Sequence, residues 1–192
     1  MLESSPIKLD IGCGPNKVGC DWLGIDSIAY DGVDMVGDVF EVLAEIESES
    51  VDKIHTSHFL EHIDDLSRFL SECERVLKVG GDLEIIVPHF SNPYYYSDPT
   101  HRIFFGLYSM SYFVGGKLFA REVPSYSYDF FLQLLSVKLI FKDVKPFYLS
   151  YLIRRVFGYL INFSVFSMEF YERWLSKLFW CYEIRYSLKK KA

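Results

Sequence analysis

The sequence lacks the marks of several protein classes. Its four cysteines form no CxxC pair and are not densely spaced, which argues against a disulfide framework or a cysteine zinc site. The longest charge-free apolar stretch of the aromatic second half, Val156 to Met168, has 13 residues, whereas a membrane-spanning helix needs about 20. The N-terminus has no basic region before an apolar run. No secretory signal is therefore expected, and the cytoplasm is the expected location.

Repeats, low-complexity tracts and linker-like segments rich in Pro, Gly or Ser are also absent. A hydrophobic content of 50% and a charged content of 24% are typical of a packed globular protein and exclude a disordered one. We therefore expect residues 1–192 to form a single domain.

Charged and aromatic residues are unevenly distributed along the chain. Residues 1–100 contain 20 acidic and 6 basic side chains, whereas residues 101–192 contain 6 acidic and 14 basic ones. Of the 34 aromatic residues, 25 lie in the second part. So acidic a first half argues against a nucleic-acid partner.

Short apolar runs alternate with segments of helical periodicity in the first half, which indicates a parallel sheet with crossover helices. A helix over residues 65–78 is the clearest element, because its apolar residues share one face. Asp64 or Asp65 caps its start, and the glycine pair at 80–81 ends it. Strands are predicted at residues 7–11, 22–26, 33–36, 51–56, 83–87, 136–141 and 182–188, with a short helix at 40–46.

A glycine turn follows the first strand, in Asp10-Ile11-Gly12-Cys13-Gly14. Glycines let a ligand approach the backbone closely at the carboxyl edge of an open parallel sheet. However, Lys17 stands where a dinucleotide fingerprint has its third glycine, and the seven residues from Pro15 to Asp21 are too few for an ordinary crossover helix. An NAD or FAD pyrophosphate would lack its usual helix N-terminus, which argues against that cofactor class.

A series of five motifs is more specific than the glycine turn. The chain contains, in order, Asp10 to Gly14, Gly24 to Asp26, Gly37 to Val39, Ser57 to His62 and Leu77 to Gly81. Over residues 6–105 it resembles class I S-adenosylmethionine-dependent methyltransferases, particularly small bacterial members associated with surface-polysaccharide biosynthesis. The resemblance implies an α/β, Rossmann-like fold: a seven-stranded, mostly parallel sheet with an antiparallel last strand, a shortened first crossover and a helical aromatic insertion before the last strand.

The resemblance also implies which residues bind S-adenosylmethionine. Gly12 and Gly14 would give the methionine end of the cofactor room at the backbone, with Asp10 near its ammonium group. His58 or its neighbouring backbone would close over the methionine moiety. For Asp10 an alternative stays open, because a carboxylate beside a glycine turn also bonds local amides.

Two further carboxylates end adjacent strands. By the same resemblance, Asp26 would accept hydrogen bonds from the ribose diol, while Asp38 would accept the adenine amino group, with the Val39 amide near the ring. Ligands of open α/β sheets bind outside the carboxyl ends of the strands, which favours this interpretation. The alternative is that Asp26 and Asp38 are polar strand ends in turns.

The acceptor is expected at residues 88–102, which concentrate two histidines, three tyrosines and an Asp-Pro turn. Methyl transfer is an in-line displacement that needs alignment and, for a hydroxyl acceptor, removal of a proton. His89 and His101 are the candidate bases, with Asp98 orienting one imidazole. Alternatively, Asp98 and Pro99 begin a helix. The predicted reaction is methyl transfer to a hydroxyl of a sugar or a lipid-linked glycan.

Two other functions compete with this hypothesis. His58, Glu61 and His62 match the HxxEH pattern of zinc proteases, in which two histidines bind the metal on a helix. Because this segment directly follows a strand and precedes the helix cap at residues 64–65, we expect a turn and no metal; a zinc hydrolase is a distant alternative. The nearer alternative is a non-catalytic cofactor-binding or scaffold protein with a methyltransferase fold.

The domain therefore divides into a cofactor-binding half, residues 1–105, and an acceptor and cover half, residues 106–192. Most of the second half is expected to cover the sheet. Arg102 or Arg121 would hold an anionic group of the acceptor. Residues 146–180 are predicted to contact anionic lipid at the inner face of a membrane or to form a homodimer. One helical face there is polar and charged, opposite an aromatic face, and comprises Glu169, Glu172, Arg173, Ser176 and Lys177.

Overall fold

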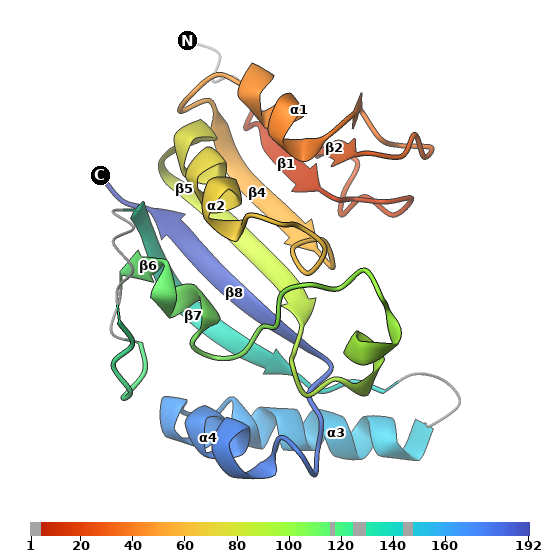
Figure 1. Cartoon of the computed structure of the whole chain (residues 1–192), viewed down its shortest axis with the longest axis vertical. Helices are drawn as coiled ribbons and strands as arrows, with labels where there is room; N and C mark the ends of the chain where they lie inside the picture. Colours follow the sequence, from red (N-terminus) through yellow and green to blue (C-terminus); the bar gives the residue numbers. More distant parts are fainter. Residues whose placement is uncertain (1–4, 116–117, 125–129, 144–147) are drawn as a thin grey trace.

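A single twisted sheet runs through the molecule (Figure 1). The computed structural model describes residues 5–115, 118–124, 130–143 and 148–192. Two parts of the sequence predictions lie outside these ranges. They are residues 1–4, at the N-terminus where no signal was expected, and residues 146–147, at the start of the segment predicted to contact lipid. Within the described residues the strands are β1 (Lys8–Ile11), β2 (Leu23–Asp26), β3 (Met35–Val36), β4 (Val51–Ser57), β5 (Leu77–Pro88), β6 (Val114–Gly115), β7 (Phe130–Ile140) and β8 (Glu183–Lys190).

The directions of the strands confirm the predicted fold. The sheet has the order β3-β2-β1-β4-β5-β8-β7-β6. Strands β1 to β5 are parallel, and β8 is antiparallel to both of its neighbours, β5 and β7. The seven predicted strands are all present, and β6 is an additional two-residue strand at the edge. Because β8 is inserted between β5 and β7, its first residue, Glu183, lies opposite Pro88 at the end of β5.

Two helices, α1 (Val39–Glu45) and α2 (Leu66–Val76), cover one face of the sheet (Figure 1). As predicted, Asp65 caps α2, its side chain accepting a hydrogen bond from the Arg68 amide. The predicted C-terminal end is wrong by two residues. Leu77 is extended and begins β5 by pairing with Val51 of β4, so the sheet rather than the helix takes this residue.

Between β1 and β2, residues 12–22 form turns and no helix, which confirms the shortened first crossover. Beyond β5 two segments differ from expectation. The predicted loop at 91–99 contains a 3₁₀ turn at Pro93–Ser97, whose Asn92 cap bonds the Tyr94 amide. The predicted helix at 108–114 is only a 3₁₀ turn, Ser109–Tyr112.

The helical insertion before the last strand is present. Helix α3 (Tyr148–Ile161), helix α4 (Val165–Phe170) and a π-helical turn (Tyr171–Leu175) lie across the end of the sheet at which β5 and β7 finish (Figure 1). Among the described residues, no helix is long and apolar enough to cross a membrane.

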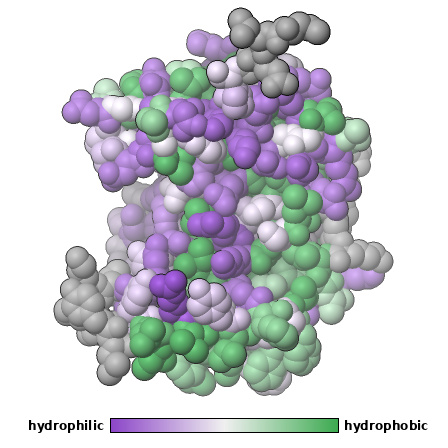
Figure 2. All heavy atoms as spheres, turned by 180° about the vertical axis from the view of Figure 1, so that it is seen from behind, coloured by the Kyte–Doolittle hydropathy of each residue, from purple (hydrophilic) through white to green (hydrophobic). Residues whose placement is uncertain are grey.

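The orientation of this insertion differs from that of an ordinary cover helix. Glu169 and Glu172 turn inward and accept hydrogen bonds from the protein, and Ser176 is buried. Opposite them, large apolar side chains are exposed, and they form the apolar area at the bottom of Figure 2. We call this area the C-terminal apolar surface; it comprises Tyr151, Leu152, Ile153, Val156, Tyr159, Leu160, Phe163, Phe166, Phe170, Trp174, Leu178 and Phe179.

Candidate functional site

A cavity of about 510 Å³ lies at the carboxyl ends of the first strands. Its walls come from the turn after β1, the end of β2, the start of α1 and the turn between β4 and α2. Four of the residues predicted to bind the cofactor are brought together there: Gly12, Asp26, Asp38 and Val39. The predicted residues Asp10, Gly14 and His58 are not part of the cavity lining.

Gly12 is the position at which this cavity most needs a glycine. Its φ is +68°, and a Cβ there would lie 2.6 Å from the Phe59 ring. A side chain would therefore be strained and would collide with the wall. The bare backbone of Gly12 thus lets the turn after β1 pack directly against Phe59 in the wall of the cavity.

The two carboxylates of the cavity also organise its backbone. Asp26 accepts hydrogen bonds from the amides of Gly14 and Ile28, both at 2.9 Å, and so holds the glycine turn against the end of β2. Asp38 caps α1, with Oδ1 accepting from the Phe40 amide at 2.9 Å. Both residues are therefore polar strand ends that hold turns, as the alternative interpretation predicted. Both side chains also line the cavity. Each carboxylate oxygen has more than one lone pair, so these side chains can fix the shape of the cavity and still accept hydrogen bonds from a ligand.

Asp10 lies in a different environment. It is buried, with Oδ2 accepting from the Val18 amide and Oδ1 bonded to His55 Nδ1, both at 2.7 Å. The local hydrogen bonding that the sequence left open is therefore present. A contact of Asp10 with the cofactor's ammonium group stays a prediction.

His58 stands at the end of β4 in a left-handed backbone conformation, with a φ of +54°. Its Nε2 is 3.1 Å from Glu183 Oε2, and its Nδ1 is 3.4 Å from Glu61 Oε1. Burial opposes the charge on the ring, but the two carboxylates outweigh it and raise the pKa of His58 to about 9. His58 is therefore protonated at neutral pH.

Glu183 was not found by sequence reasoning. Although burial opposes its charge, His58 and Lys142, whose Nζ is 2.8 Å away, lower the pKa of its carboxyl group. The contact joins residues 125 positions apart and exists only because β8 lies next to β5. No local pattern in the sequence could have indicated it.

The two candidate bases have different surroundings. His89 is fully buried; the Ser91 amide donates to its Nδ1, so the ring proton is on Nε2, which donates to Glu172 at 3.2 Å. His101 is partly buried, and its Nδ1 donates to the Tyr95 carbonyl at 2.9 Å. Their catalytic roles stay predictions.

Asp98 lies 3.7 Å from His101, measured from Oδ2 to Nε2. Its Oδ1 accepts from both the amide and the hydroxyl of Thr100. No helix follows, so the alternative that Asp98 and Pro99 begin one is wrong. The hydrogen bonds from Thr100 to the Asp98 side chain instead form a local turn.

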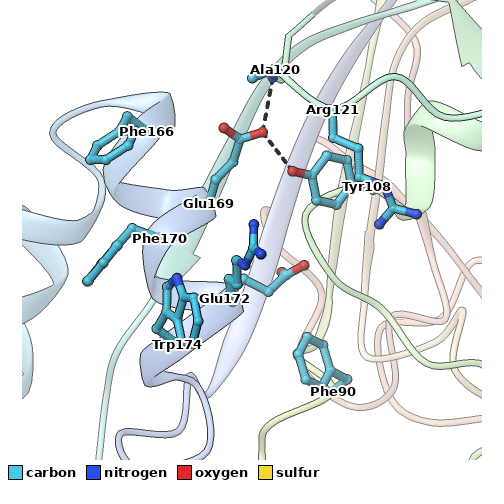
Figure 3. Close-up of a pocket in the computed structure, with 10 residues that line it drawn as sticks. Phe90, Tyr108, Ala120, Arg121, Phe166, Glu169, Phe170, Glu172 and Trp174 are labelled. Atoms are coloured by element: carbon cyan, nitrogen blue, oxygen red, sulfur yellow. Dashed lines mark hydrogen bonds between the residues drawn. The ribbon is translucent and has the colours of Figure 1, made fainter.

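A second, larger cavity of about 680 Å³ lies between Tyr108 and residues 120–121 on one side and α4 with the π-helical turn on the other (Figure 3). Glu169 accepts hydrogen bonds there from the Tyr108 hydroxyl at 2.6 Å and from the Ala120 amide at 3.0 Å. Burial, and then Glu169, raise the pKa of Tyr108, which keeps this phenol neutral and donating. Arg121 lies over the Tyr108 ring, 5.3 Å from its centre.

Glu172 forms another wall of this cavity (Figure 3). It is held by His89 and by the Leu107 amide, which donates to Oε2 at 2.7 Å. Of the two arginines predicted to hold an acceptor anion, Arg121 lines the cavity, whereas Arg102 forms an ion pair with Asp64. The sequence did not single out Glu169 and Glu172, because a charged helical face usually faces solvent.

Comparisons with known proteins agree with this geometry. Residues 9–85 match a family model described as a methyltransferase domain. No curated protein matches the chain. Among solved structures, an S-adenosylmethionine-dependent methyltransferase from Archaeoglobus fulgidus is 21% identical with a TM-score of 0.60, covering 96% of this chain and 86% of that one.

Two other solved structures share the fold at 16% identity. Phosphoethanolamine N-methyltransferase 2 of Haemonchus contortus, in complex with S-adenosylmethionine, has a TM-score of 0.56; the whole of this chain covers 50% of that one. Geranyl diphosphate C-methyltransferase of Streptomyces coelicolor A3(2), in complex with S-adenosylhomocysteine, has a TM-score of 0.53, with 96% and 73% covered. The chain thus has the fold of the S-adenosylmethionine-dependent methyltransferases, and this fold together with the family match supports S-adenosylmethionine as its cofactor and methyl transfer as its activity.

Proposed function

We propose that the protein transfers a methyl group from S-adenosylmethionine to a hydroxyl of a sugar or a lipid-linked glycan. The observation that carries the proposal is the 510 Å³ cavity, in which Gly12, Asp26 and Asp38 meet at the carboxyl edge of adjacent parallel strands. When bound, the cofactor supplies a methyl group on a positively charged sulfur. The acidic side chains of the cavity suit that charge and the ribose hydroxyls.

The 680 Å³ cavity has the chemistry of an acceptor site. Its size is typical of small-molecule sites. Phe90 and Trp174 offer aromatic faces, Glu169 and Glu172 offer hydrogen-bond acceptors for hydroxyls, and Arg121 offers a cation for a phosphate or carboxylate. The phosphoethanolamine and geranyl diphosphate enzymes that share the fold are named for small phosphate-bearing molecules, which is in keeping with an arginine in this wall.

Two further cavities share wall residues with these sites. One shares Asp64 and Asp65 with the cofactor cavity, and its other wall includes Phe105 and Ser109. The next includes these same two residues together with Glu172, which also lines the acceptor cavity. Each cavity thus shares wall residues with the next, from the cofactor cavity to the acceptor cavity.

In this proposal Glu172 takes the proton of the acceptor hydroxyl. It lines the cavity, whereas His89 is enclosed and acts by holding the Glu172 carboxylate through Nε2. His58 is protonated at neutral pH and does not serve as a base. His101 and Asp98 remain the alternative pair from the sequence.

The C-terminal apolar surface suggests where the acceptor comes from. Phe166, Phe170 and Trp174 belong both to this surface and to the wall of the acceptor cavity. An amphipathic acceptor would place its sugar in the cavity and its lipid on the surface. We propose that this surface rests on anionic lipid at the inner face of a membrane, because Arg155 and Lys177 are exposed on it while its acidic residues turn inward. A homodimer through the same surface is the alternative.

Cofactor binding separates the enzyme from the scaffold alternative. We expect S-adenosylhomocysteine to bind the unmutated chain in calorimetry and Asp26→Ala to weaken it by about 10- to 100-fold, because hydrogen bonds to a carboxylate are lost. Asp31→Ala, an exposed aspartate outside the cavity, is the matched control and should bind as the unmutated chain does. Glu172→Gln should keep cofactor binding and lose transfer of labelled methyl to lipid-linked glycan. If the unmutated chain binds no cofactor, the proposed function is wrong.

A further inference from the structure

Three side chains that the proposed reaction does not use converge beside the cofactor cavity. Glu61, His62 and His101 each place one potential ligand atom within 4.8 Å of the others. Glu61 and His62 lie in the turn after β4, and His101 lies in the segment after β5. The backbone already joins these two segments, because the Arg102 amide donates to the Glu61 carbonyl at 2.7 Å.

Glu61 is an unusual carboxylate. Its side chain is 1% exposed, and both of its oxygens are buried without a hydrogen-bond partner. The nearest cation, His58, is 3.4 Å away at ion-pair distance, and His58 is shared with Glu183. The Tyr95 hydroxyl is buried without a partner as well. A buried carboxylate is unfavourable unless its oxygens are hydrogen-bonded or bound to cations, and neither oxygen of Glu61 accepts a hydrogen bond. Glu61 therefore has lone pairs available for a further positive ligand beside His58.

The hydrogen bonds around the two histidines fix where their protons are. His101 Nδ1 faces the Tyr95 carbonyl, which can only accept, so this nitrogen carries the proton. The single hydroxyl proton of Thr100 goes to the Asp98 carboxylate at 2.6 Å. Thr100 must therefore accept from His62 Nδ1, 2.8 Å away. In the neutral form of each ring, the lone pair is therefore on Nε2.

This is the arrangement found around metal-binding histidines, which donate their other ring nitrogen to a carbonyl or carboxylate partner. Here a carbonyl holds His101 directly, and the Asp98 carboxylate holds His62 through Thr100. The two rings lie 4.7 Å apart, centre to centre. The structure therefore brings two imidazole rings next to one buried carboxylate whose oxygens make no hydrogen bond.

We propose that Glu61, His62 and His101 bind one divalent transition-metal ion of the zinc type, which clamps the segment after β5 onto the turn after β4. Two imidazoles favour zinc, iron or manganese over magnesium and calcium, which prefer oxygen ligands. Zinc ligands lie about 2.0–2.2 Å from the ion, so a small closure of the turn suffices. Because His62 also lines the cofactor cavity, the ion stiffens one of its walls.

The proposed ligand set differs from the HxxEH pattern. That pattern would use His58 and His62 on one helix, but residues 58–62 form a turn and His58 is engaged with Glu183. With its Nε2 on a metal ion, His101 would not be free to act as a general base. The proposed methyl transfer uses Glu172 as the base and does not require the ion, so the two proposals can be tested separately.

The test uses the full chain without an affinity tag, stripped of metal with a chelator. We expect Zn²⁺ to bind with one ion per chain in calorimetry, and Co²⁺ in its place to give the visible absorption of a nitrogen- and oxygen-bound ion. His101→Gln and Glu61→Gln should each weaken Zn²⁺ binding by more than about 100-fold, since even outer partners of metal ligands contribute about 10- to 100-fold. His58→Gln is the matched control and should retain one ion.

Two results would overturn the proposal. One is an unmutated chain that gives neither stoichiometric Zn²⁺ binding nor a Co²⁺ spectrum, a measurement that needs no variant to fold. The other is an equal loss of binding in His58→Gln and His101→Gln, with circular dichroism showing both folded. The two proposals fail separately. A chain that binds no metal ion can still bind S-adenosylhomocysteine, and a chain that binds no S-adenosylhomocysteine can still bind a metal ion.

Discussion

Helix α2 in the first half and the helices before the last strand bury opposite kinds of side chain. In α2 the apolar face is buried, and Phe69, Leu70 and Cys73 are completely inaccessible. In residues 151–179 the carboxylates of the helical face turn inward while Phe163, Leu178 and their neighbours are exposed. The first arrangement makes a core, and the second makes a lined cavity with an apolar exterior. Side chains of the second region are therefore placed for contact with other molecules.

The largest difference between the two regions should be in stability. Phe69→Ala should lower the free energy of unfolding by about 3–5 kcal/mol, because it leaves a cavity in the core. Phe163→Ala, at a side chain that is 88% exposed, should change it by less than about 0.5 kcal/mol. Urea titrations of both variants measure this. Comparable losses would mean that Phe163 is covered in solution, as in a homodimer.

For membrane binding, in contrast to stability, the larger effect is expected in the helices before the last strand. Phe163→Ser should weaken binding to vesicles containing anionic lipid by roughly tenfold, about 1.4 kcal/mol, because an inserted ring is lost. Ile28→Ser makes a similar change at an exposed position of the acidic half and should leave binding unchanged. Co-sedimentation with vesicles gives both values. A chain that is dimeric and binds no vesicles would instead support the homodimer.

A smaller effect is expected at His58, whose ion pair with Glu183 joins the cofactor-binding half to β8 in the second half. Its pKa of about 9 lies above the usual value of 6.5, so the folded state binds the proton more tightly. The stabilisation is complete below pH 6.5 and is lost as the pH rises through 9. Since the ring is 40% exposed, solvent screening reduces the effect to about 1 kcal/mol.

Urea titrations between pH 6 and pH 10 check this prediction. His58→Gln should flatten that part of the stability curve, whereas Asp31→Ala should leave its slope unchanged. A slope that persists in His58→Gln would show that another group is responsible.

Much of the cofactor-binding half could be predicted from the sequence because its signals are local. The glycine turn, the cap at Asp65 and the carboxylates at the ends of β2 and the β3 turn follow from patterns within a few residues. The end of α2 could not be predicted in this way. Leu77 continues the helical pattern, yet pairing with Val51 draws it into the sheet. A strand partner 26 residues away overrides the local period there.

In the second half the sequence predicted the two long strands and the helical insertion between them, but not the orientation of that insertion. Periodicity distinguishes the two faces of the helix at residues 169–179, but it does not state which face meets the protein. Glu172 is turned inward by His89 and by the Leu107 amide. These partners lie 83 and 65 residues away, so only the packed structure shows them.

By itself the sequence determined the sheet, its shortened first crossover and the resemblance that predicts a methyltransferase, because each depends on short-range pattern and motif order. The tertiary structure decided which charged groups meet. Placing β8 between β5 and β7 brings Glu183 to His58, and folding the segment after β5 back over the turn after β4 brings His101 to Glu61. Such contacts join residues far apart in the sequence and depend on the order of the strands in the sheet, so short-range patterns do not predict them.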